Sequence, residues 1–243
     1  MDIYLLAFIT LLTSAFAAIM GQGGGLMLMG VLAGSVPATS LVAVHGIIQA
    51  SSNASRAFIV KEHINWPVLL PVTLGILLGA TLFMPLISVF NWQWMQGIIA
   101  IYILWLTWGH LLPKFGLHIL KVKSRQPLFK LGLLQGGLGM ALGATGPLGN
   151  ALLLKLELKK EAIIATNAVI MLLSHLVKII FFSVMGVQLA EYAELLIYLS
   201  LAAIAGSYLG SFFRQRLPEN IFLPLFKVVL TFLALRMLFL ALP

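Results

Sequence analysis

Long apolar stretches separated by short polar loops make up almost the whole chain, and two glycine-rich breaks interrupt the series. The stretches cover residues 3–20, 26–32, 38–60, 66–90, 94–112, 128–142, 148–154, 162–185, 190–213 and 221–242. An apolar segment of roughly 18 or more residues is long enough to cross a bilayer as a helix. Because a spanning backbone must satisfy its own hydrogen bonds, the pattern predicts an all-α polytopic membrane protein.

The composition agrees with a bilayer environment. Charged residues make up 9% of the 243 residues and hydrophobic residues 61%, whereas soluble domains carry roughly 25% charged residues. The formal net charge is +8, but the basic residues lie mostly in short loops, where the positive-inside rule explains them. We therefore expect membrane lipid around the protein and no nucleic-acid partner.

The two halves of the chain share one order of segments: a span, a glycine break, a short apolar piece and three full spans. Adding 122 to the residue number places Gly21 on Gly143 and Arg56 on Lys178. Internal repeats of this size are common in transporter folds. The predicted division is a first transmembrane repeat at 1–112, a cytoplasmic basic linker at 113–127 and a second transmembrane repeat at 128–243.

Loop charges favour one topology over another. If each half crossed the membrane four times, the basic loops of the second half would lie outside, against the positive-inside rule. If each glycine break is the tip of a re-entrant hairpin, each half crosses three times and the repeats are inverted. The basic residues that then face the cytoplasm are Lys61, Lys114, Lys121, Lys123, Arg125, Lys155, Lys159, Lys160, Arg214 and Arg216. We therefore predict inverted repeats, with both termini outside the cytoplasm.

The two glycine breaks are candidate substrate contacts. They consist of Gly21, Gln22, Gly23, Gly24 and Gly25 in the first half and Gly143, Ala144, Thr145 and Gly146 in the second. Glycine allows a sharp turn and close approach to a ligand, and the helix after each break directs free N–H groups, which attract anions, at the bilayer midplane. The alternative is close helix packing by small residues. On the first interpretation, Gly24→Leu blocks transport and leaves the protein folded.

Two polar stripes are the second candidate feature. The first contains His45, Gln49, Ser52 and Arg56 on one helix face, with Asn53 beside them. The second contains Asn167, Ser174 and Lys178, with His175 beside them. Polar groups in a membrane are costly and usually face a bundle interior or an aqueous path. The alternative is that they form helix–helix hydrogen bonds, with Arg56 snorkelling to the interface.

The acidic residues are informative by their position. All seven lie in or beside loops, so no carboxylate lies deep in a span. Buried cations without buried anions need a negative partner, and a small anionic substrate supplies one. We therefore predict that Lys178, with Arg56 as its repeat partner, attracts that substrate. His45 and His175 are the stripe groups able to titrate near neutral pH, so proton coupling through this site would use them.

The sequence gives little support for an enzyme. It contains no cysteine, which excludes a thiolate metal site and a cysteine nucleophile, and it has no G-x-S-x-G or H-E-x-x-H motif. We expect no catalytic residue, no metal and no cofactor. A channel or carrier for another anion or a neutral solute, and an intramembrane enzyme, are the alternatives.

The stretch at 14–57 resembles the TauE/SafE sulfite exporter family, whose two repeats each open with a hydrophobic segment and a G-x-G-G-G element. Here that element is residues 21–25, and the second half keeps Gly132, Gly136 and Gly143, although its break reads GATGP. The resemblance extends in layout over essentially the whole chain. It implies movement of small sulfur-containing anions such as sulfite or organosulfonates. From the repeated halves we expect a secondary transporter that works by alternating access, in a bacterial inner membrane. The residues alone indicate only an anion.

Overall fold

The computed structural model describes residues 2–88, 94–108, 126–153, 156, 158–214 and 219–241, and all regular structure in these residues is helical. The helices of the first half are α1 (Ile3–Met20), α2 (Gly24–Leu32), α3 (Ala38–Ile59), η1 (Lys61–His63), α4 (Trp66–Ser88) and α5 (Met95–Trp108). Those of the second half are α6 (Gln126–Leu142), α7 (Gly146–Leu153), α8 (Lys160–Val184), η5 (Leu189–Tyr192), α9 (Ala193–Phe213) and α10 (Glu219–Ala241). The prediction of an all-helical chain is confirmed for these residues.

Each predicted apolar segment corresponds to one of the helices α1 to α10, with ends that agree within a few residues. The short helices η1 and η5 were not predicted. Most of the predicted basic linker, up to residue 125, lies outside the described residues, as do Lys155 and Arg216.

The ends of α1 follow from local chemistry. The Asp2 carboxylate accepts a hydrogen bond from the Tyr4 N–H at 3.2 Å, which caps the start of the helix. Gly21 then ends α1 with φ of 76°, and Gly143 ends α6 in the same way with φ of 74°. Glycine is the residue that adopts this left-handed conformation without a Cβ penalty. Both breaks therefore begin with the same kind of turn.

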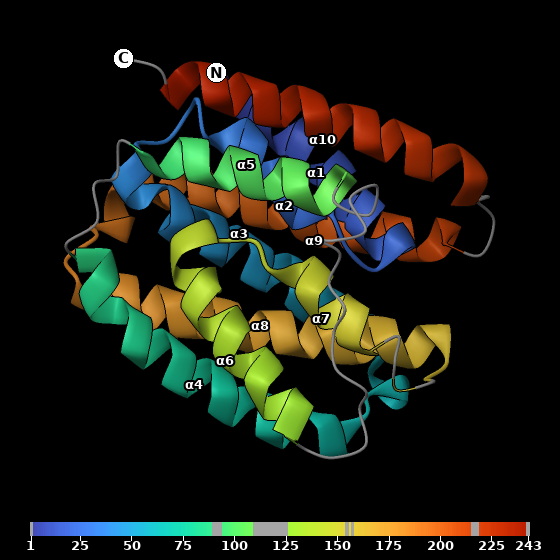
Figure 1. The fold of residues 1–243 in the computed structure, drawn as a ribbon. Coiled ribbons are helices and arrows are strands. Elements are labelled where there is room, and N and C mark those ends of the chain that lie inside the picture. The colour runs from blue at the N-terminus through green and yellow to red at the C-terminus, as the bar shows by residue number, and fades with distance from the viewer. Residues whose placement is uncertain are drawn as a thin grey trace.

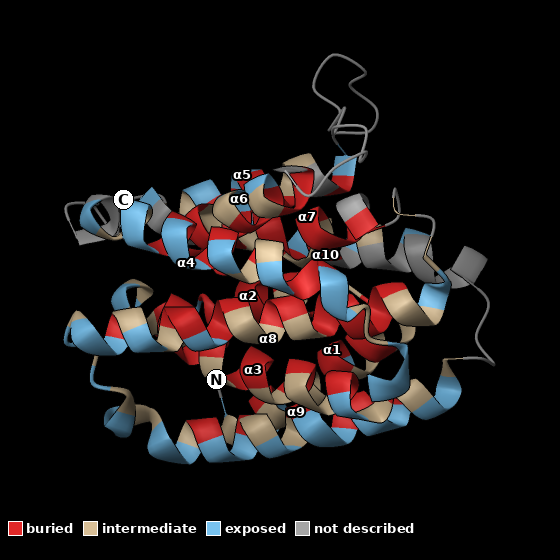
Figure 2. Ribbon diagram, turned by 90° about the horizontal axis from the view of Figure 1, so that it is seen from below, coloured by how far each residue is buried: buried red, intermediate tan, exposed pale blue. Residues whose placement is uncertain are grey.

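Four of the described helical segments are long and apolar enough to cross a membrane: Ile3–Met20, Trp66–Pro85, Lys160–Val184 and Leu189–Phe213. Polar side chains on these helices face the interior and apolar side chains face outward, which is the reverse of the arrangement in a soluble protein. On α1, Thr10 and Thr13 are buried, while Tyr4 and Phe8 are 67% and 59% exposed. Exposed residues follow the outer faces of the helices and buried ones face inward (Figure 2). The protein is an integral membrane protein, because such an outer surface needs lipid around it.

The central helices α3 and α8 pack against each other and run antiparallel (Figure 1). Gly46 on α3 lies against Ile179 on α8, and the N–H of Asn65, which follows η1, bonds the Thr166 hydroxyl at 2.9 Å. Helix α9 packs on α3 and α4 packs on α8. The two helices that carry the polar stripes, α3 and α8, are thus covered by other helices.

Two further helix pairs cross between the halves, α1 with α9 and α4 with α6. A Cβ at Gly206 on α9 would overlap the Leu11 carbonyl of α1, and a Cβ at Gly79 on α4 would overlap the Leu133 carbonyl of α6. Backbones approach this closely in membranes only where small residues line the contact. Leu133 lies 122 residues after Leu11, so the two contacts are equivalent.

The helix directions separate the loop charges. Helix α3 ends where α8 begins, and α9 runs alongside α3, as the 3.0 Å contact between the Ser52 and Ser207 hydroxyl groups shows. Lys61, Lys160 and Arg214 therefore gather at one end, which we call the basic end, where Glu62 and Glu161 also lie. The opposite end, which we call the acidic end, carries Asp2, Glu191 and Glu194.

Candidate functional site

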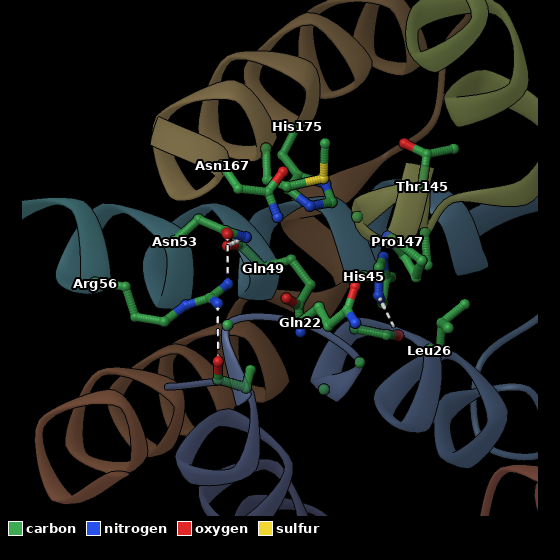
Figure 3. A pocket seen from close by; sticks show the side chains of 18 residues that line it. Gln22, Leu26, His45, Gln49, Asn53, Arg56, Thr145, Pro147, Asn167 and His175 are labelled. Atoms are coloured by element: carbon green, nitrogen blue, oxygen red, sulfur yellow. Dashed lines mark hydrogen bonds between the residues drawn. The ribbon is translucent and has the colours of Figure 1, made fainter. Parts of the chain in front are cut away.

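The polar stripe of α3 lies inside the protein. His45, Gln49, Ser52, Asn53 and Arg56 are all buried, none more than 6% exposed. They share one face because residues three and four apart are neighbours on a helix. His45, Gln49, Asn53 and Arg56 are directed at the cavity between α8 and the two glycine breaks (Figure 3), whereas Ser52 faces α9.

The stripe of α8 is buried as well, with Asn167, Ser174, His175 and Lys178 at most 3% exposed. The rings of His175 and His45 lie edge to face with centroids 5.7 Å apart. The His45 Nε2 lies 2.9 Å from the Gly25 carbonyl oxygen. One histidine from each predicted repeat therefore meets the other at the centre of the protein.

The breaks lie beside the middles of the central helices. A Cβ at Gly25 would lie 3.3 Å from the Gln49 amide oxygen, and a Cβ at Gly146 would lie 3.6 Å from the Met171 sulfur. Gln49 and Met171 are themselves 122 residues apart. The helices α2 and α7 therefore begin at corresponding places, on either side of the α3–α8 contact.

The glycines of the first break have different neighbours and therefore different roles. A Cβ at Gly24 would overlap the Thr13 carbonyl and the Ala17 methyl group, so Gly24 permits close packing of α1 and α2. The expectation that Gly24→Leu leaves the protein folded is not supported by this contact, because a larger side chain there separates two helices. Gly25 instead faces Gln49 and His45, so it is the glycine whose substitution tests the site.

A small cavity of about 30 Å³ lies between the breaks and the stripes. This is room for about two water molecules. Among the predicted site residues, its lining includes Gly21, Gln22, Gly23, Gly24, Gly25, His45, Gln49, Asn53, Arg56, Ala144, Thr145, Gly146, Asn167 and His175. Ser52, Gly143, Ser174 and Lys178 are not part of the lining. Ser52 instead contacts Ser207 on α9.

Both stripe cations point at helix ends rather than at lipid. Arg56 donates from Nη1 to the Ala17 carbonyl in the last turn of α1 at 3.1 Å, and from Nη2 to the Asn53 amide oxygen (Figure 3). Lys178 donates to the Gly143 carbonyl, just past the end of α6. Cations are favourable at C-terminal helix ends. Snorkelling to the interface, the alternative for Arg56, is therefore wrong.

The site is positively biased. The buried polar residues of the described chain include Arg56 and Lys178 but no aspartate or glutamate. Several cavity-lining polar atoms also have no hydrogen-bond partner among the described residues. They include the donors Gln49 Nε2 and Arg56 Nε and the Thr145 hydroxyl, along with the Asn167 Oδ1, which accepts, and the Nδ1 atoms of His45 and His175. Buried donors are usually satisfied in native proteins. The arrangement suits a ligand that is anionic and accepts hydrogen bonds.

The sequence model of the sulfite exporter TauE/SafE family matches residues 6–237. The chain belongs to the TauE/SafE family. No curated protein and no solved structure gives a match. Membership makes the protein a membrane transporter of a family named for sulfite export, and the match includes every residue of the cavity lining.

Sequence reasoning missed several residues of this TauE/SafE site. Pro147 and Met171 line the cavity, and the buried Gln135 donates to the Thr145 carbonyl at 3.3 Å. Gln135 carried a signal, since it is a polar residue deep in an apolar span, like those of the stripes. Pro147 ends the second break and Met171 holds the repeat position of Gln49, so the sequence placed both beside the predicted contacts, but their apolar side chains kept them off the list of site residues.

Proposed function

We propose that this TauE/SafE protein is a secondary transporter that moves small oxyanions, sulfite or organosulfonates, across a bacterial inner membrane. The central cavity is the proposed substrate site, and its lining residues are the proposed contacts. The observation that carries the proposal is the positive bias of a buried cavity with unpartnered donors.

The charge argument follows from the cost of burial. An ion taken out of water loses several kcal/mol of solvation unless other groups replace the solvent. Arg56 and Lys178 are compensated by carbonyl oxygens, which carry only partial charge. An oxyanion beside them recovers more of the lost solvation than a neutral solute does. A cation would meet the same two charges as repulsion.

Backbone groups supplement the side chains. The first N–H groups of a helix have no partner within it, and α2 begins at Gly24 beside the cavity. On α7, the first turn contains Pro147, which has no N–H to offer. We therefore assign the stronger backbone contribution to α2 and a side-chain contribution, from Thr145, to the second break.

Inverted repeats and alternating access are part of the proposal. The exchange of partners between halves, α1 with α9 and α4 with α6, supports a repeat, as do the equivalent contacts at Gly206 and Gly79. The antiparallel α3 and α8 support opposite orientations. We propose repeats at 1–112 and 128–243, joined by a cytoplasmic linker, that rock about the central site.

Flux through the purified protein in liposomes tests this function. The panel is sulfite, methanesulfonate, sulfate, acetate and a neutral sulfoxide, each supplied against an imposed gradient. We expect accumulation of sulfite or the sulfonate above equilibrium when a proton gradient is present, and none of the neutral compound. Flux that only follows each solute's own gradient would identify a channel, and preference for the neutral sulfoxide would remove the anion proposal.

A further inference from the structure

A second and larger cavity, about 430 Å³ in volume, lies at the basic end beside the first turn of α8. We call it the basic-end vestibule. Its lining includes Met20, Gln22, Asn150, Lys160, Ile163 and Ile164. Met20 is the last residue of α1 and Lys160 the first of α8, so the vestibule lies where two helix ends meet.

The vestibule and the central cavity are neighbours. Gln22 lines both of them. The turn at Gly21 is closed off on the vestibule side by Ile164, whose side chain would lie 2.9 Å from a Cβ at Gly21, and by the Asn150 amide. The glycine break therefore lies between the two cavities, and the Gln22 side chain borders both of them.

The vestibule also has the chemistry of an anion site. It is bordered by the first turn of α8, a helix of 25 residues whose start attracts negative charge, and by the exposed Lys160; the carboxylate of that turn, Glu161, lies outside the lining. Asn150 is 7% exposed, and its Oδ1 has no partner among the described residues. An amide oxygen accepts hydrogen bonds and would repel an oxyanion, but the same amide turned by 180° presents its NH2 group, which donates to one.

The acidic end differs. The cavity there, about 440 Å³ in volume, is lined by Thr39, Ser40, Phe182 and Glu191 among others, and shares no residue with the central cavity. Along α8, His175 lines the central cavity and Phe182 lines the acidic-end cavity. Lys178 lies between them with its amine held by Gly143. In this conformation the central cavity therefore lies closer to the basic-end vestibule, with which it shares Gln22, than to the acidic-end cavity.

We propose that the basic-end vestibule is a second binding site for the same small oxyanions, through which they reach or leave the central cavity, and that Gln22 is the partition they pass. The inference rests on the proposed function. It assigns Lys160 and Asn150 to a capture step that is separate from the central site, and it places this step on the side of the basic loops.

The chain has no cysteine, so single cysteines test the vestibule directly in the full-length protein in membrane vesicles. Ile163→Cys and Leu158→Cys, which line the vestibule, are labelled with a membrane-impermeant thiol reagent from each side. Methanesulfonate is the probe, because sulfite itself reacts with thiol reagents. Thr39→Cys, in the acidic-end cavity, is the matched control.

We expect labelling of both vestibule cysteines from the cytoplasmic side, slowed about tenfold by methanesulfonate at ten times its Kd, as mass action requires. Sodium gluconate should not slow it, and labelling of Thr39→Cys should be indifferent to both salts. Labelling that methanesulfonate leaves unchanged, or that comes only from the opposite side, overturns the proposal. Having two vestibule positions keeps the test decisive if one variant does not fold.

Two lysine substitutions provide a second test of the vestibule. Lys160→Gln should lower the apparent affinity for methanesulfonate severalfold, whereas Lys159→Gln, a neighbouring exposed lysine outside the lining, should not. Calorimetry on the unmodified protein separates the two proposals. Binding of methanesulfonate without protection of the vestibule cysteines rejects the vestibule alone, and absence of binding of both methanesulfonate and sulfite rejects the proposed function.

Discussion

The Lys178 ammonium group donates to the carbonyl of Gly143, across the contact between α8 and the second glycine break. In the first half, Arg56 makes the corresponding contact with Ala17. The two cations thus hold the ends of the broken helices in place and charge the site at the same time. Substituting them tests both roles.

We expect the Lys178 ammonium group, which does not line the cavity in this conformation, to turn from Gly143 to the bound anion. Lys178→Gln should then weaken sulfite binding by about ten- to a hundredfold, because hydrogen bonds to charged groups are worth roughly 1.5–3 kcal/mol and each decade of affinity takes about 1.4 kcal/mol. Lys178→Arg should recover much of the loss. Lys227→Gln is the matched control, since Lys227 lies 5.5 Å over the Trp108 ring, away from the cavity. Equal affinities for wild type and a folded Lys178→Gln would show that the Lys178 charge does not contribute to anion binding.

Gly25→Ala tests the cavity itself. The added methyl group would lie 3.3 Å from the Gln49 oxygen and 3.6 Å from the His45 ring, inside a space of about 30 Å³. We expect loss of anion binding by at least about tenfold with little change in thermal stability. Gly46→Ala, whose methyl group would make an ordinary 3.7 Å contact with Ile179, is the control. Normal binding by Gly25→Ala would mean that substrate binds elsewhere.

Substitution of a glycine at a helix–helix contact should lower the stability of the protein, whereas substitution of Gly25 should lower anion binding. Gly206→Ala forces its methyl group onto the Leu11 carbonyl, so we expect destabilisation of about 1–3 kcal/mol, seen as a lower unfolding temperature in detergent. Gly97→Ala, with an ordinary 3.5 Å contact to Ala241, should unfold like wild type. A Gly206→Ala protein as stable as wild type would show that α1 and α9 are not tightly packed.

The topology predicts the side from which each end is reached. With cysteine placed at Glu62 and at Glu191, an impermeant maleimide should label the first only from the cytoplasmic side and the second only from outside. Leu201, which is 61% exposed on an apolar face, should stay unlabelled as cysteine because lipid covers it. Labelling of both acidic positions from one side would exclude an odd number of crossings between them.

The paired histidines predict a pH effect. A protonated imidazole beside an anion is favoured, so anion binding should draw in protons and tighten as the pH falls. Replacing both His45 and His175 with glutamine should abolish proton uptake in calorimetry across buffers of different ionisation enthalpy. Uptake that survives the double substitution would assign it to other groups.

The sequence predicted the helices well because apolar segments and glycine breaks mark them directly, as at α1, whose predicted and observed ends coincide. It also grouped the stripe residues, since helical spacing alone puts them on one face. It did not predict where Arg56 and Lys178 point. Their partners are carbonyl groups 39 and 35 residues away, and a carbonyl has no side chain to reveal it. The role of Gly24 was missed for the same reason.

The exchange of helices between halves has a consequence for how such a chain can be divided. The glycine face of α9 is covered by α1, and that of α4 by α6, so each half supplies the covering for the other. Two fragments cut at the linker would stay interlocked, while either fragment alone would leave a glycine groove open to lipid. With the inverted repeats that we propose, a gene encoding one half could give a complete molecule only as a pair of subunits inserted in opposite directions.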